Sequence, residues 1–331
     1  MIKNIVYFLY FFKQTNWKKL TKDLTYVSRK CDISKIRLLK ELFSSSLKFG
    51  SSFHEYFYFG FYMKEENVQE EYATMGFMRD YHKKNNPFEK RFLLEDKKVF
   101  LEEYGLFIGR NWLDVSKSNK SKISDFVNGK DKIVLKKSRG VAGRDIKVID
   151  LREISIESLM RLIKKKKFDL VEDFIRQHPD LMNLSPNSVN TIRVITQIDK
   201  KGKPVILGAI LRMGIYKNTD NMSTGGIASK VNINTGIVAG PGTSFDISLP
   251  DCYTHPVTKK EIVGFAIPYW DEVTDLCKKA ALVHPENKSV GWDVAINEHK
   301  PVLIEGNHNW GARLWQIPEK EGKKNVLMNY V

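Results

Sequence analysis

The chain has 331 residues and a formal net charge of +15, and 42% of its residues are hydrophobic and 28% charged. This balance is typical of a folded globular protein and excludes the disordered and fibrous classes. The length allows one large domain with an appendage, or two domains. The positive charge favours anionic partners, which include nucleic acid, lipid headgroups and phosphorylated or carboxylated small molecules.

The cysteines and the N-terminal stretch indicate where the protein resides. Cys31, Cys252 and Cys277 form neither a metal-spaced pair nor an even-numbered disulfide framework, which predicts a reducing, cytoplasmic location. The opening MIKNIVYFLYFF carries no secretory signal and is shorter than the ~20 residues that a membrane-spanning helix needs. It is either the start of a buried helix or an interfacial anchor, so any membrane contact is expected to be peripheral and at the inner face.

The lysine-rich segments do not by themselves indicate a nucleic-acid site. The run KKKK at 164–167 is more typical of a solvated face than of a binding surface. The sequence has no zinc finger, no helix-turn-helix pattern and no RNA-binding aromatic signature. Specific nucleic-acid binding is therefore not expected.

The first part of the chain is predicted to be helical. In ISKIRLLKELFSSSLKFG, apolar residues recur at three and four spacing and the pattern ends on Gly50. The aromatic FHEYFYFGFYM and a charged helix through EEYATMGFMRDYHKK follow. Because Asn85, Asn86 and Pro87 break the pattern, we place a boundary there and predict a helical N-terminal region over residues 1–87.

Beyond residue 87 strands and helices mix. Strands often follow each other directly and outnumber the helices, which predicts an α+β fold with largely antiparallel sheets. Apolar and β-branched runs predict strands at 132–136, 146–151, 168–175, 191–198 and 204–213. Helical periodicity predicts helices at 155–166 and 268–283.

The stretch KIVLKKSRGVAGRDIKVID places a glycine loop between two strands. The first strand ends at Lys136, and Gly140 and Gly143 follow. Glycines let backbone amides approach an anion, and a lysine at the loop edge can reach phosphate oxygens. The loop is not a Walker A motif, because no Lys-Ser/Thr pair follows the glycines and the next element is a strand. The alternative is a plain hairpin turn.

The segment VGWDVAINEHKPVLIEGNHNWG predicts an antiparallel hairpin with carboxylates inside it. A turn near residue 299 sets Asp293 opposite Glu305, ~5 Å apart, and Asn307 on the same face. Opposed like charges repel unless a cation lies between them, and Mg²⁺ prefers such oxygen ligands. The alternative is a register shifted by one residue, which turns one carboxylate to solvent.

The lysine strand with its glycine loop, the acidic strand LVEDFI and the hairpin, in this order, resemble the ATP-grasp superfamily. The stretches QHPDLMNLSPNSVNTIRVIT, GAILRMG and DNMSTGGIASKVNINTG narrow the resemblance to the sugar-transfer-associated group, linked to bacterial capsule and exopolysaccharide gene sets. The resemblance covers roughly residues 88–318. It implies two α+β subdomains that clamp ATP, within a domain at 88–331: the first at 88–170 with the phosphate loop, the second at 171–331 with the metal site.

The resemblance also implies roles for single residues. Lys97 corresponds to an early phosphate-contacting lysine, although Lys98 is an alternative. The implied ATP-binding residues are Lys136, Ser138, Gly140, Gly143, Glu172, Asp173, Phe174 and Ile175. Glu172 would meet the adenine amino group, unless it is a solvated carboxylate at a strand end. Asp293, Glu305 and Asn307 would bind Mg²⁺, with Glu305 bridging two ions, and Mn²⁺ could substitute.

The implied reaction is a Mg·ATP-dependent carboxylate–amine ligation through an acyl-phosphate. Many members of the superfamily have an arginine two residues before the metal aspartate, where this chain has Gly291. Arg193 and Arg212, each interrupting an apolar strand, are our substitutes as oxyanion-stabilising residues, with structural salt bridges as the alternative. Arg313 is a weaker third candidate.

The substrates are predicted only as classes. The charge and the resemblance favour an anionic small molecule, such as a uronic acid, a sugar nucleotide or an amino acid, together with an amine acceptor. The polar loop 220–230 is expected to contact acceptor or phosphates, and His308, Asn309 and Trp310 either line the acceptor site or are structural. Two alternatives to the ligase remain: an ATP-dependent kinase, and a basic nucleic-acid-binding or scaffold protein with a degenerate nucleotide fold.

Overall fold

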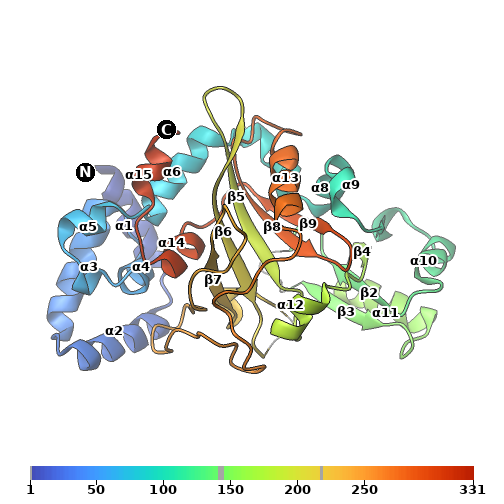
Figure 1. The fold of residues 1–331 in the computed structure, drawn as a ribbon, viewed down its shortest axis with the longest axis horizontal. Helices are drawn as coiled ribbons and strands as arrows, with labels where there is room; N and C mark the ends of the chain where they lie inside the picture. The colour runs from blue at the N-terminus through green and yellow to red at the C-terminus, as the bar shows by residue number, and fades with distance from the viewer. Residues whose placement is uncertain (1, 141–144, 217–218) are drawn as a thin grey trace.

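Figure 1 shows the fold in a computed structural model, which describes residues 2–140, 145–216 and 219–331. A helical region at one end of the molecule leads to a small sheet at the other end. The chain then builds a larger central sheet between the two, and its last two helices return to the helical region. The N-terminal and C-terminal segments therefore lie on the same side of the central sheet.

The helical region begins and ends its helices where the sequence supplies capping residues. Its elements are α1 (Ile2–Gln14), α2 (Trp17–Cys31), α3 (Lys35–Phe49), α4 (Phe53–Tyr58), the short 3₁₀ turn η1 (Phe61–Met63), α5 (Glu66–Glu70) and α6 (Met75–Asn85). The side chains of Asn16, Ser34 and Thr74 accept hydrogen bonds from the first turns of α2, α3 and α6. Gly50 ends α3 with a positive φ of 65°, as the pattern predicts.

Aromatic rings hold this region together. Phe53, at the start of α4, has four rings with centroids between 5.4 and 6.3 Å from its own: Phe8, Phe12, Trp17 and Phe43. These rings come from α1, α2 and α3, so the aromatic segment of the sequence is the part on which the three long helices pack.

The small sheet has four antiparallel strands in the order β1-β4-β2-β3, which are β1 (Trp112–Asp114), β4 (Leu170–Asp173), β2 (Lys132–Lys136) and β3 (Ile146–Asp150). Short helices lead into it: η2 (Phe88–Lys90), α7 (Phe92–Glu95), α8 (Lys97–Glu103), α9 (Gly105–Ile108), η3 (Val115–Lys117) and α10 (Lys120–Val127). Of these helices, α7, α8 and α9 pack on the central sheet. The helix α11 (Ile156–Lys166) connects β3 to β4.

The two faces of the small sheet differ. One face packs its buried side chains, such as Leu135 and Val171, against Leu159 and Ile163 of α11. The other face carries the side chains of Lys136 and Glu172, and at its β3 edge it leaves Ile146 45% and Val148 42% exposed. This open apolar part of the face adjoins the cleft between the two sheets.

The central sheet has five antiparallel strands in the order β7-β6-β5-β8-β9, which are β7 (Ile227–Val231), β6 (Pro204–Met213), β5 (Thr191–Ile198), β8 (Ser289–Ile296) and β9 (Pro301–Asn307). Its helices are α12 (Pro179–Leu184), η4 (Met222–Thr224), α13 (Trp270–Ala281), α14 (Arg313–Glu319) and α15 (Lys324–Met328). The predicted α+β class with antiparallel sheets is confirmed.

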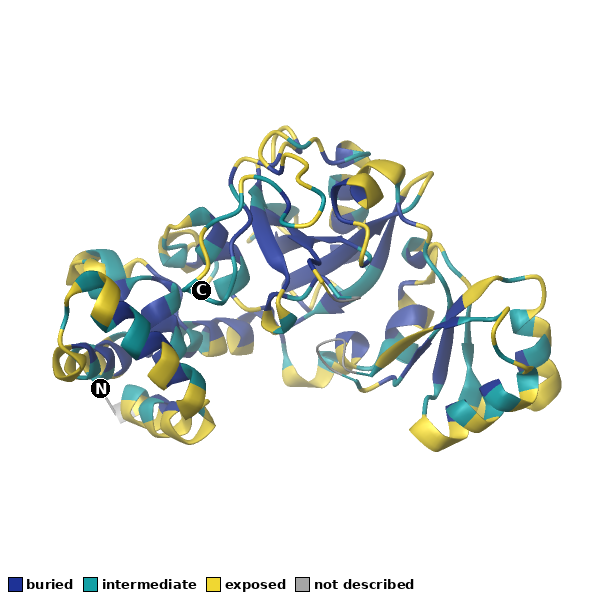
Figure 2. Ribbon diagram, turned by 90° about the horizontal axis from the view of Figure 1, so that it is seen from below, coloured by how far each residue is buried: buried dark blue, intermediate teal, exposed yellow. Residues whose placement is uncertain are grey.

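Both faces of the central sheet are covered, which makes it the most deeply buried part of the chain (Figure 2). Ile192 and Val194 of β5 join the core cluster that includes α13. Ile195, on the opposite face, packs with Trp310 and Trp315. Because side chains alternate along a strand, Arg193 also lies on this second face, where the polar site is built.

The hairpin of β8 and β9 has the predicted register, with Asp293 paired to Glu305. The register shifts next to this pair: Leu303 pairs with Val294, so Ile304 is an extra residue without a partner on β8. Such a bulge twists the strand and re-aims its side chains. It turns both Ile304 and Glu305 toward the same cavity.

One expectation from the sequence meets a different outcome. Residues 220–230 are not one loop, because the 3₁₀ turn η4 occupies Met222–Thr224 and β7 begins at Ile227. The glycine pair at 225–226 ends the loop and starts the strand. The predicted boundary at residue 87 lies between α6 and η2, and it stays a prediction, since α6 packs Met78 and Tyr81 against the central sheet.

Candidate active site

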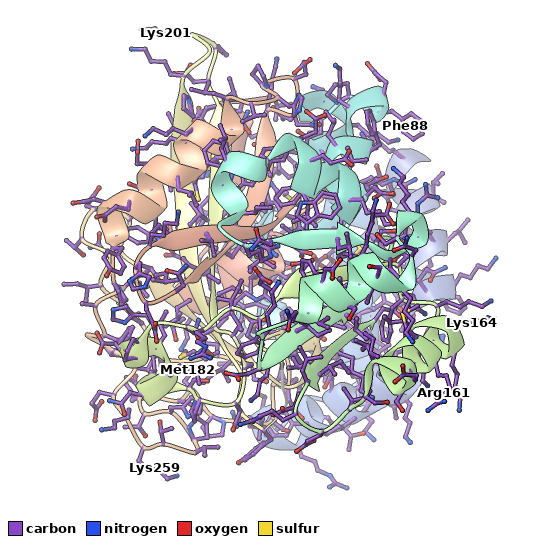
Figure 3. All side chains as sticks on the ribbon, turned by 90° about the vertical axis from the view of Figure 1, so that its right-hand side faces the viewer. Phe88, Arg161, Lys164, Met182, Lys201 and Lys259 are labelled. Carbon is purple, nitrogen blue, oxygen red and sulfur yellow. The ribbon has the colours of Figure 1, made fainter. Side chains whose placement is uncertain are left out.

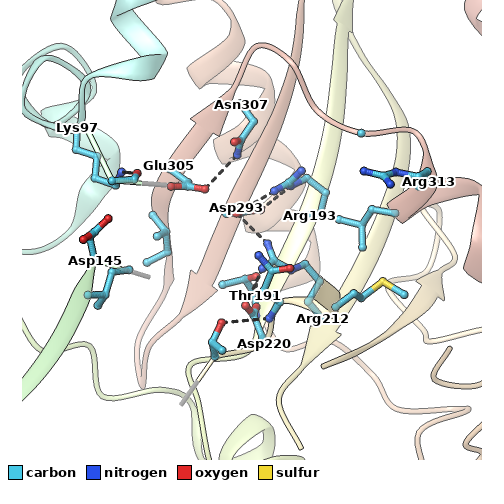
Figure 4. Close-up of a pocket in the computed structure, with 18 of the residues that line it drawn as sticks. Lys97, Asp145, Thr191, Arg193, Arg212, Asp220, Asp293, Glu305, Asn307 and Arg313 are labelled. Carbon is cyan, nitrogen blue, oxygen red and sulfur yellow. Dashed lines mark hydrogen bonds and ion pairs between the residues drawn. The ribbon is translucent and has the colours of Figure 1, made fainter. Parts of the chain in front are cut away.

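A cavity of about 310 Å³ lies between the two sheets and collects most of the predicted polar residues (Figure 4). In Figure 4, Lys97 and Asp145 lie at one side and Arg313 at the other, with Asp293 between them. On one side the cavity is lined by the second face of the central sheet and by the segment that begins α14. On the other side it is lined by Lys97 at the start of α8 and by Ile146 at the start of β3. Both sheets therefore contribute to its walls.

The centre of the site is a row of charges across three neighbouring strands. Arg193 of β5 pairs in register with Asp293 of β8, which pairs with Glu305 of β9. Asn307 lies beside them and donates a hydrogen bond from Nδ2 to Oε1 of Glu305 at 3.3 Å. The row contains one cation, Arg193, and two carboxylates. Since Arg193 pairs with Asp293, the charge of Glu305 on β9 is left without a counter-charge in this row.

Asp293 is held by two arginines. Arg193 donates from Nε and Nη2 to the two carboxylate oxygens at 2.5 and 3.0 Å, and Arg212 donates from Nη1 to Oδ2 at 2.9 Å. Burial would raise the pKa of Asp293, but the two guanidinium charges overcome it and hold this pKa at about 2. Asp293 is therefore ionised, and its Oδ1 still has an acceptor position beyond the bond from Arg193.

A second buried carboxylate extends this network. Arg212 also pairs with Asp220 through Nη2 at 2.7 Å, and Asp220 accepts hydrogen bonds from the backbone N–H and the hydroxyl of Thr191. Burial raises the pKa of Asp220 more than Arg212 lowers it. Asp220 is the first residue of the polar segment 220–230, which is expected to contact acceptor or phosphates, but the sequence pattern predicts no role of its own for it.

Gly291 leaves the space on β8 that the side chain of Arg193 occupies from the neighbouring strand β5. A Cβ at Gly291 would lie 3.1 Å from Cδ of Arg193 and 2.7 Å from Cβ of Trp310. The space beside β8 at this point is thus filled by Arg193 from β5 and by Trp310, so β8 itself has no room for a side chain there. The absence of an arginine at position 291 and the presence of Arg193 on the neighbouring strand are thus linked, because Arg193 occupies the space that a side chain at position 291 would need.

Glu305 has no ion-pair partner among the residues that the structure describes, although Lys97 and Arg193 are near enough to act on its charge. Its side chain is half-buried and lines the cavity. Burial and the charge of Asp293 raise its pKa. A bound cation would offset both the burial of this carboxylate and its repulsion by Asp293. Glu305 is therefore suited to be a ligand of Mg²⁺.

The chemistry of the donor set fits Mg²⁺. Asp293, Glu305 and Asn307 offer carboxylate and amide oxygens on one face, and no histidine or cysteine accompanies them. Among the described residues, no group of three or more His, Cys, Asp or Glu side chains forms a metal cluster. Two carboxylates and one amide therefore suit an ion that keeps water or phosphate oxygens as its other ligands.

Lys97 and Lys98 have different surroundings. Lys97 lines the cavity and its ammonium group donates to the carbonyl of Gly140. Lys98 pairs with Asp114 at 2.7 Å and with Asp169 at 3.1 Å. Of the two alternatives, Lys97 is the lysine that faces the site.

Lys136 and Glu172 form a buried ion pair. The Lys136 ammonium lies 2.8 Å from Oε1 and 2.9 Å from Oε2 of Glu172, and Arg110 donates from Nε to Oε2 at 2.5 Å. Against the effect of burial, these two cations hold the pKa of Glu172 at about 2, whereas burial lowers the pKa of Lys136. The alternative of a solvated Glu172 at a strand end is wrong.

Arg110 is a residue that the sequence analysis missed. Besides Glu172 it donates to the carbonyls of Leu303 at 2.6 Å and Ile304 at 3.4 Å, so one guanidinium joins β4 of the small sheet to β9 of the central sheet. In the sequence, the one sign of Arg110 is its place directly after Gly109. In the structure, Val302 lies where a Cβ of residue 109 would be, so only glycine fits before this arginine.

The predicted phosphate loop is described in part. Ser138 donates from its hydroxyl and its backbone N–H to Asp169, both at 2.7 Å. Gly140 lines the cavity, and a Cβ there would lie 2.8 Å from Cβ of Asp145. Gly143 lies outside the described residues.

The residues after Glu172 lie at the end of β4. Asp173 accepts from the backbone N–H and the side chain of Asn111 and pairs with Lys130 at 2.6 Å. The ring of Phe174 has the Lys132 ammonium 5.7 Å from its centroid. Neither these two residues nor Ile175 lines the central cavity, and the backbone N–H of Asp173 already donates to the carbonyl of Asn111. The adenine contacts of these three residues stay predictions.

His308 and Trp310 have structural contacts, and neither they nor Asn309 lines the cavity. His308 Nε2 lies 2.7 Å from a carboxylate oxygen of Glu95, and Trp310 is buried with its indole N–H donating to Ser289. The structural interpretation of these two residues is favoured. Arg313, in contrast, lines the cavity and stacks over Phe245, 5.7 Å from its ring centroid.

Two antiparallel sheets with a polar cleft between them agree with the predicted ATP-grasp class, and a family model covers most of the chain. The model of the family described as sugar-transfer associated ATP-grasp matches residues 76–330. The chain belongs to this family. The predicted ATP-grasp superfamily and its sugar-transfer-associated group are thereby confirmed.

Solved structures with a similar fold are more distant. The ATP-grasp ligase PsnB with its minimal precursor is 10% identical, with a TM-score of 0.45 over 77% of this chain and 66% of that chain. D-Alanine-D-alanine ligase from Helicobacter pylori is 12% identical, with a TM-score of 0.44 over 74% and 62%. N5-carboxyaminoimidazole synthetase from Staphylococcus aureus, complexed with ADP, is 8% identical, with a TM-score of 0.40 over 67% and 46%.

The chain thus spans less than two thirds of the length of each of these neighbours. No curated protein matches the sequence.

Proposed function

We propose that the protein is a Mg·ATP-dependent carboxylate–amine ligase that works through an acyl-phosphate and modifies a sugar or glycan precursor in the biosynthesis of a cell-surface polysaccharide. The observation that carries the proposal is Glu305: a carboxylate without an ion pair in the described chain, opposed to Asp293 and facing a cavity with Lys97 on the other side. This combination is suited to a cation that is bound together with phosphate groups.

The proposed ATP position follows from the chemistry of the cleft walls. The adenine ring would lie between Ile304 on the bulge and the open apolar part of the small sheet with Ile146 and Val148, next to the buried Lys136–Glu172 pair. The phosphates would run along Lys97 and the Gly140 loop toward Glu305. Both an apolar platform and a cationic path are thus available in one cleft.

Asp293, Glu305 and Asn307 would hold Mg²⁺, with Mn²⁺ as a substitute that takes the same oxygen ligands. When bound, the metal supplies the positive charge that neutralises the triphosphate. Arg193 and Arg212 keep Asp293 ionised and fix its position. We assign them a second role as fixed positive donors for the oxyanion that forms nearby.

The proposed reaction has two balanced steps. A carboxylate oxygen of the first substrate attacks the γ-phosphorus, the bond from that phosphorus to the β–γ bridging oxygen breaks, and ADP leaves. The amine nitrogen of the second substrate then attacks the carbonyl carbon of the acyl-phosphate. Inorganic phosphate and one proton are released, and an amide remains.

The substrates would enter at the end of the cavity that Arg313 lines. This guanidinium makes no hydrogen bond or ion pair with any described residue, and its contact is the face of Phe245. A cation held on an aromatic ring and open to a cavity suits an anionic group of the substrate. A uronic acid, a sugar nucleotide or an amino acid would each supply such a group.

The test is a screen of sugar acids paired with small amines, in which ADP, free phosphate and the organic product are followed by mass spectrometry. The proposal expects equal amounts of ADP, phosphate and a product joined by an amide bond. A phosphorylated product with ADP and no free phosphate would instead identify a kinase on the same fold. Glu305→Gln is the inactive control, and Glu298→Gln, exposed at the turn of the same hairpin, is the matched active control.

A further inference from the structure

Helix α1 presents a second apolar face that no described residue covers. Its inner face contributes Tyr7 and Phe11 to the aromatic core of the helical region. Its outer face carries large exposed hydrophobic side chains, of which Leu9 is 63% and Val6 58% exposed; the others are Ile5, Tyr10 and Phe12. We call these five residues the α1 patch.

The patch continues beyond the helix. Trp17, at the start of α2, is also exposed and packs edge-on against Phe12, with the ring centroids 4.8 Å apart. A helix that is apolar on all sides is normally buried in a core or in a membrane. Here one side is in the core, and within the described chain nothing covers the other. Exposed apolar patches of this kind mark interaction surfaces.

Cations border the patch. Lys13 and Lys18 are exposed at its C-terminal end, and Arg79 of α6 lies beside it, 5.7 Å from the ring centroid of Tyr10. Over α1 and α2 there is one acidic residue, Asp23, which lies buried; the basic residues are Lys3, Lys13, Lys18, Lys19, Lys22, Arg29 and Lys30. Lys3 pairs with Asp80, so the charge available to a partner comes mainly from the other end of the helix.

We infer that the α1 patch binds the surface of an anionic lipid bilayer. An interfacial helix inserts its apolar face at the boundary of headgroups and acyl chains, while lysines and arginines beside it contact anionic headgroups. Tyrosine and tryptophan, such as Tyr10 and Trp17, are the residue types preferred at that depth.

The geometry agrees with binding along the surface. At 13 residues α1 is shorter than a membrane span, and among the described residues no helix is both long and apolar enough to cross a bilayer. A second copy of the chain is a poorer occupant, because a stable protein interface buries ~800 Å² and about 20–30 residues per partner. The patch offers six large side chains including Trp17, all bordered by like charges that would repel in a symmetric pair.

The experiment is sedimentation of the full chain with vesicles, either of phosphatidylcholine alone or of phosphatidylcholine with phosphatidylserine. The test variant is Val6→Glu/Leu9→Glu, which places two charges on exposed positions and leaves the inner face of α1 intact. The matched control is Leu106→Glu on α9, which is 96% exposed and lies on the other side of the central sheet from α1 (Figure 1). Melting temperatures establish that all three proteins are folded.

We expect the wild type and Leu106→Glu to bind the anionic vesicles, the double variant to bind at least tenfold more weakly, and added salt to weaken binding. Trp17 emission should shift to shorter wavelength on binding, because the other tryptophans are buried or half-buried. No binding of the wild type, or equal binding of the double variant, would overturn the inference. So would a concentration-dependent dimer that the double variant abolishes. None of these outcomes depends on the ligase reaction.

Discussion

Two adjacent lysines at the start of α8 are expected to have separable roles. Lys97→Ala removes a cation from the cavity and should weaken Mg·ATP binding at least tenfold, which is about 1.4 kcal/mol. Lys98→Ala removes the partner of Asp114 and Asp169, so it should lower the melting temperature and leave the nucleotide affinity almost unchanged. Calorimetric titration of both variants makes the comparison. The opposite pattern would assign the phosphate contact to Lys98.

Glu172 is the residue whose loss should affect stability most. Glu172→Gln leaves Lys136 and Arg110 as buried cations without a full counter-charge, which costs about 3 kcal/mol. Glu157→Gln, in the exposed pair with Lys120, is the matched control and should change little. Urea unfolding at neutral pH checks both.

The pH dependence of this stability has a defined sign. Glu172 has a folded-state pKa of about 2, below its ordinary value of 4.5, so its ionised form stabilises the fold above pH 4.5. This contribution is lost as the pH falls from 4.5 toward 2. The difference in unfolding free energy between wild type and Glu172→Gln should therefore shrink over that interval, and a constant difference would contradict the assignment.

At the scale of elements, the strand β8 depends on the absence of a side chain at Gly291. Gly291→Ala would bring a Cβ to 2.7 Å from Cβ of Trp310 and 3.1 Å from Arg193, so the sheet or the arginine must move. We expect a loss of roughly 2 kcal/mol in unfolding free energy and weaker nucleotide binding. Gly105→Ala, in the helix α9 with open space around its Cβ, is the control and should be neutral. Wild-type stability of Gly291→Ala would show that the strand can shift at no cost.

The hairpin of β8 and β9 was predictable because its strands have a period of two and its turn is polar, and these features fix which residues oppose each other. The bulge at Ile304 was not, since a single extra residue leaves no mark on an apolar run. For the same reason Arg110 escaped notice: its partners Glu172 and Leu303 are far away in sequence, and only the folded chain brings them together. Local patterns predicted the elements, and the charge network required the tertiary structure.

At the scale of the whole molecule, the charge of +15 is spread over outer surfaces. Figure 3 shows Arg161 and Lys164 of α11 pointing away from the protein, and the run 164–167 is exposed as predicted. In the cavity, in contrast, Arg193 and Arg212 pair with Asp293 and Asp220. We therefore predict only weak duplex DNA binding at about 150 mM salt, falling steeply as salt rises. A submicromolar constant by fluorescence anisotropy would favour the nucleic-acid alternative.

The central claim is that the carboxylates of the hairpin hold the metal of Mg·ATP, and calorimetric ATP affinity with and without limiting Mg²⁺ tests it most directly. Glu305→Gln keeps the shape of the side chain but removes the charge that has no partner. It should lose at least tenfold in affinity for Mg·ATP and nothing in affinity for metal-free ATP, with an unchanged or higher melting temperature because Asp293 no longer faces a like charge. Glu298→Gln should behave as wild type. Wild-type Mg·ATP affinity in a folded Glu305→Gln would contradict the metal site, and the proposed ligase mechanism with it.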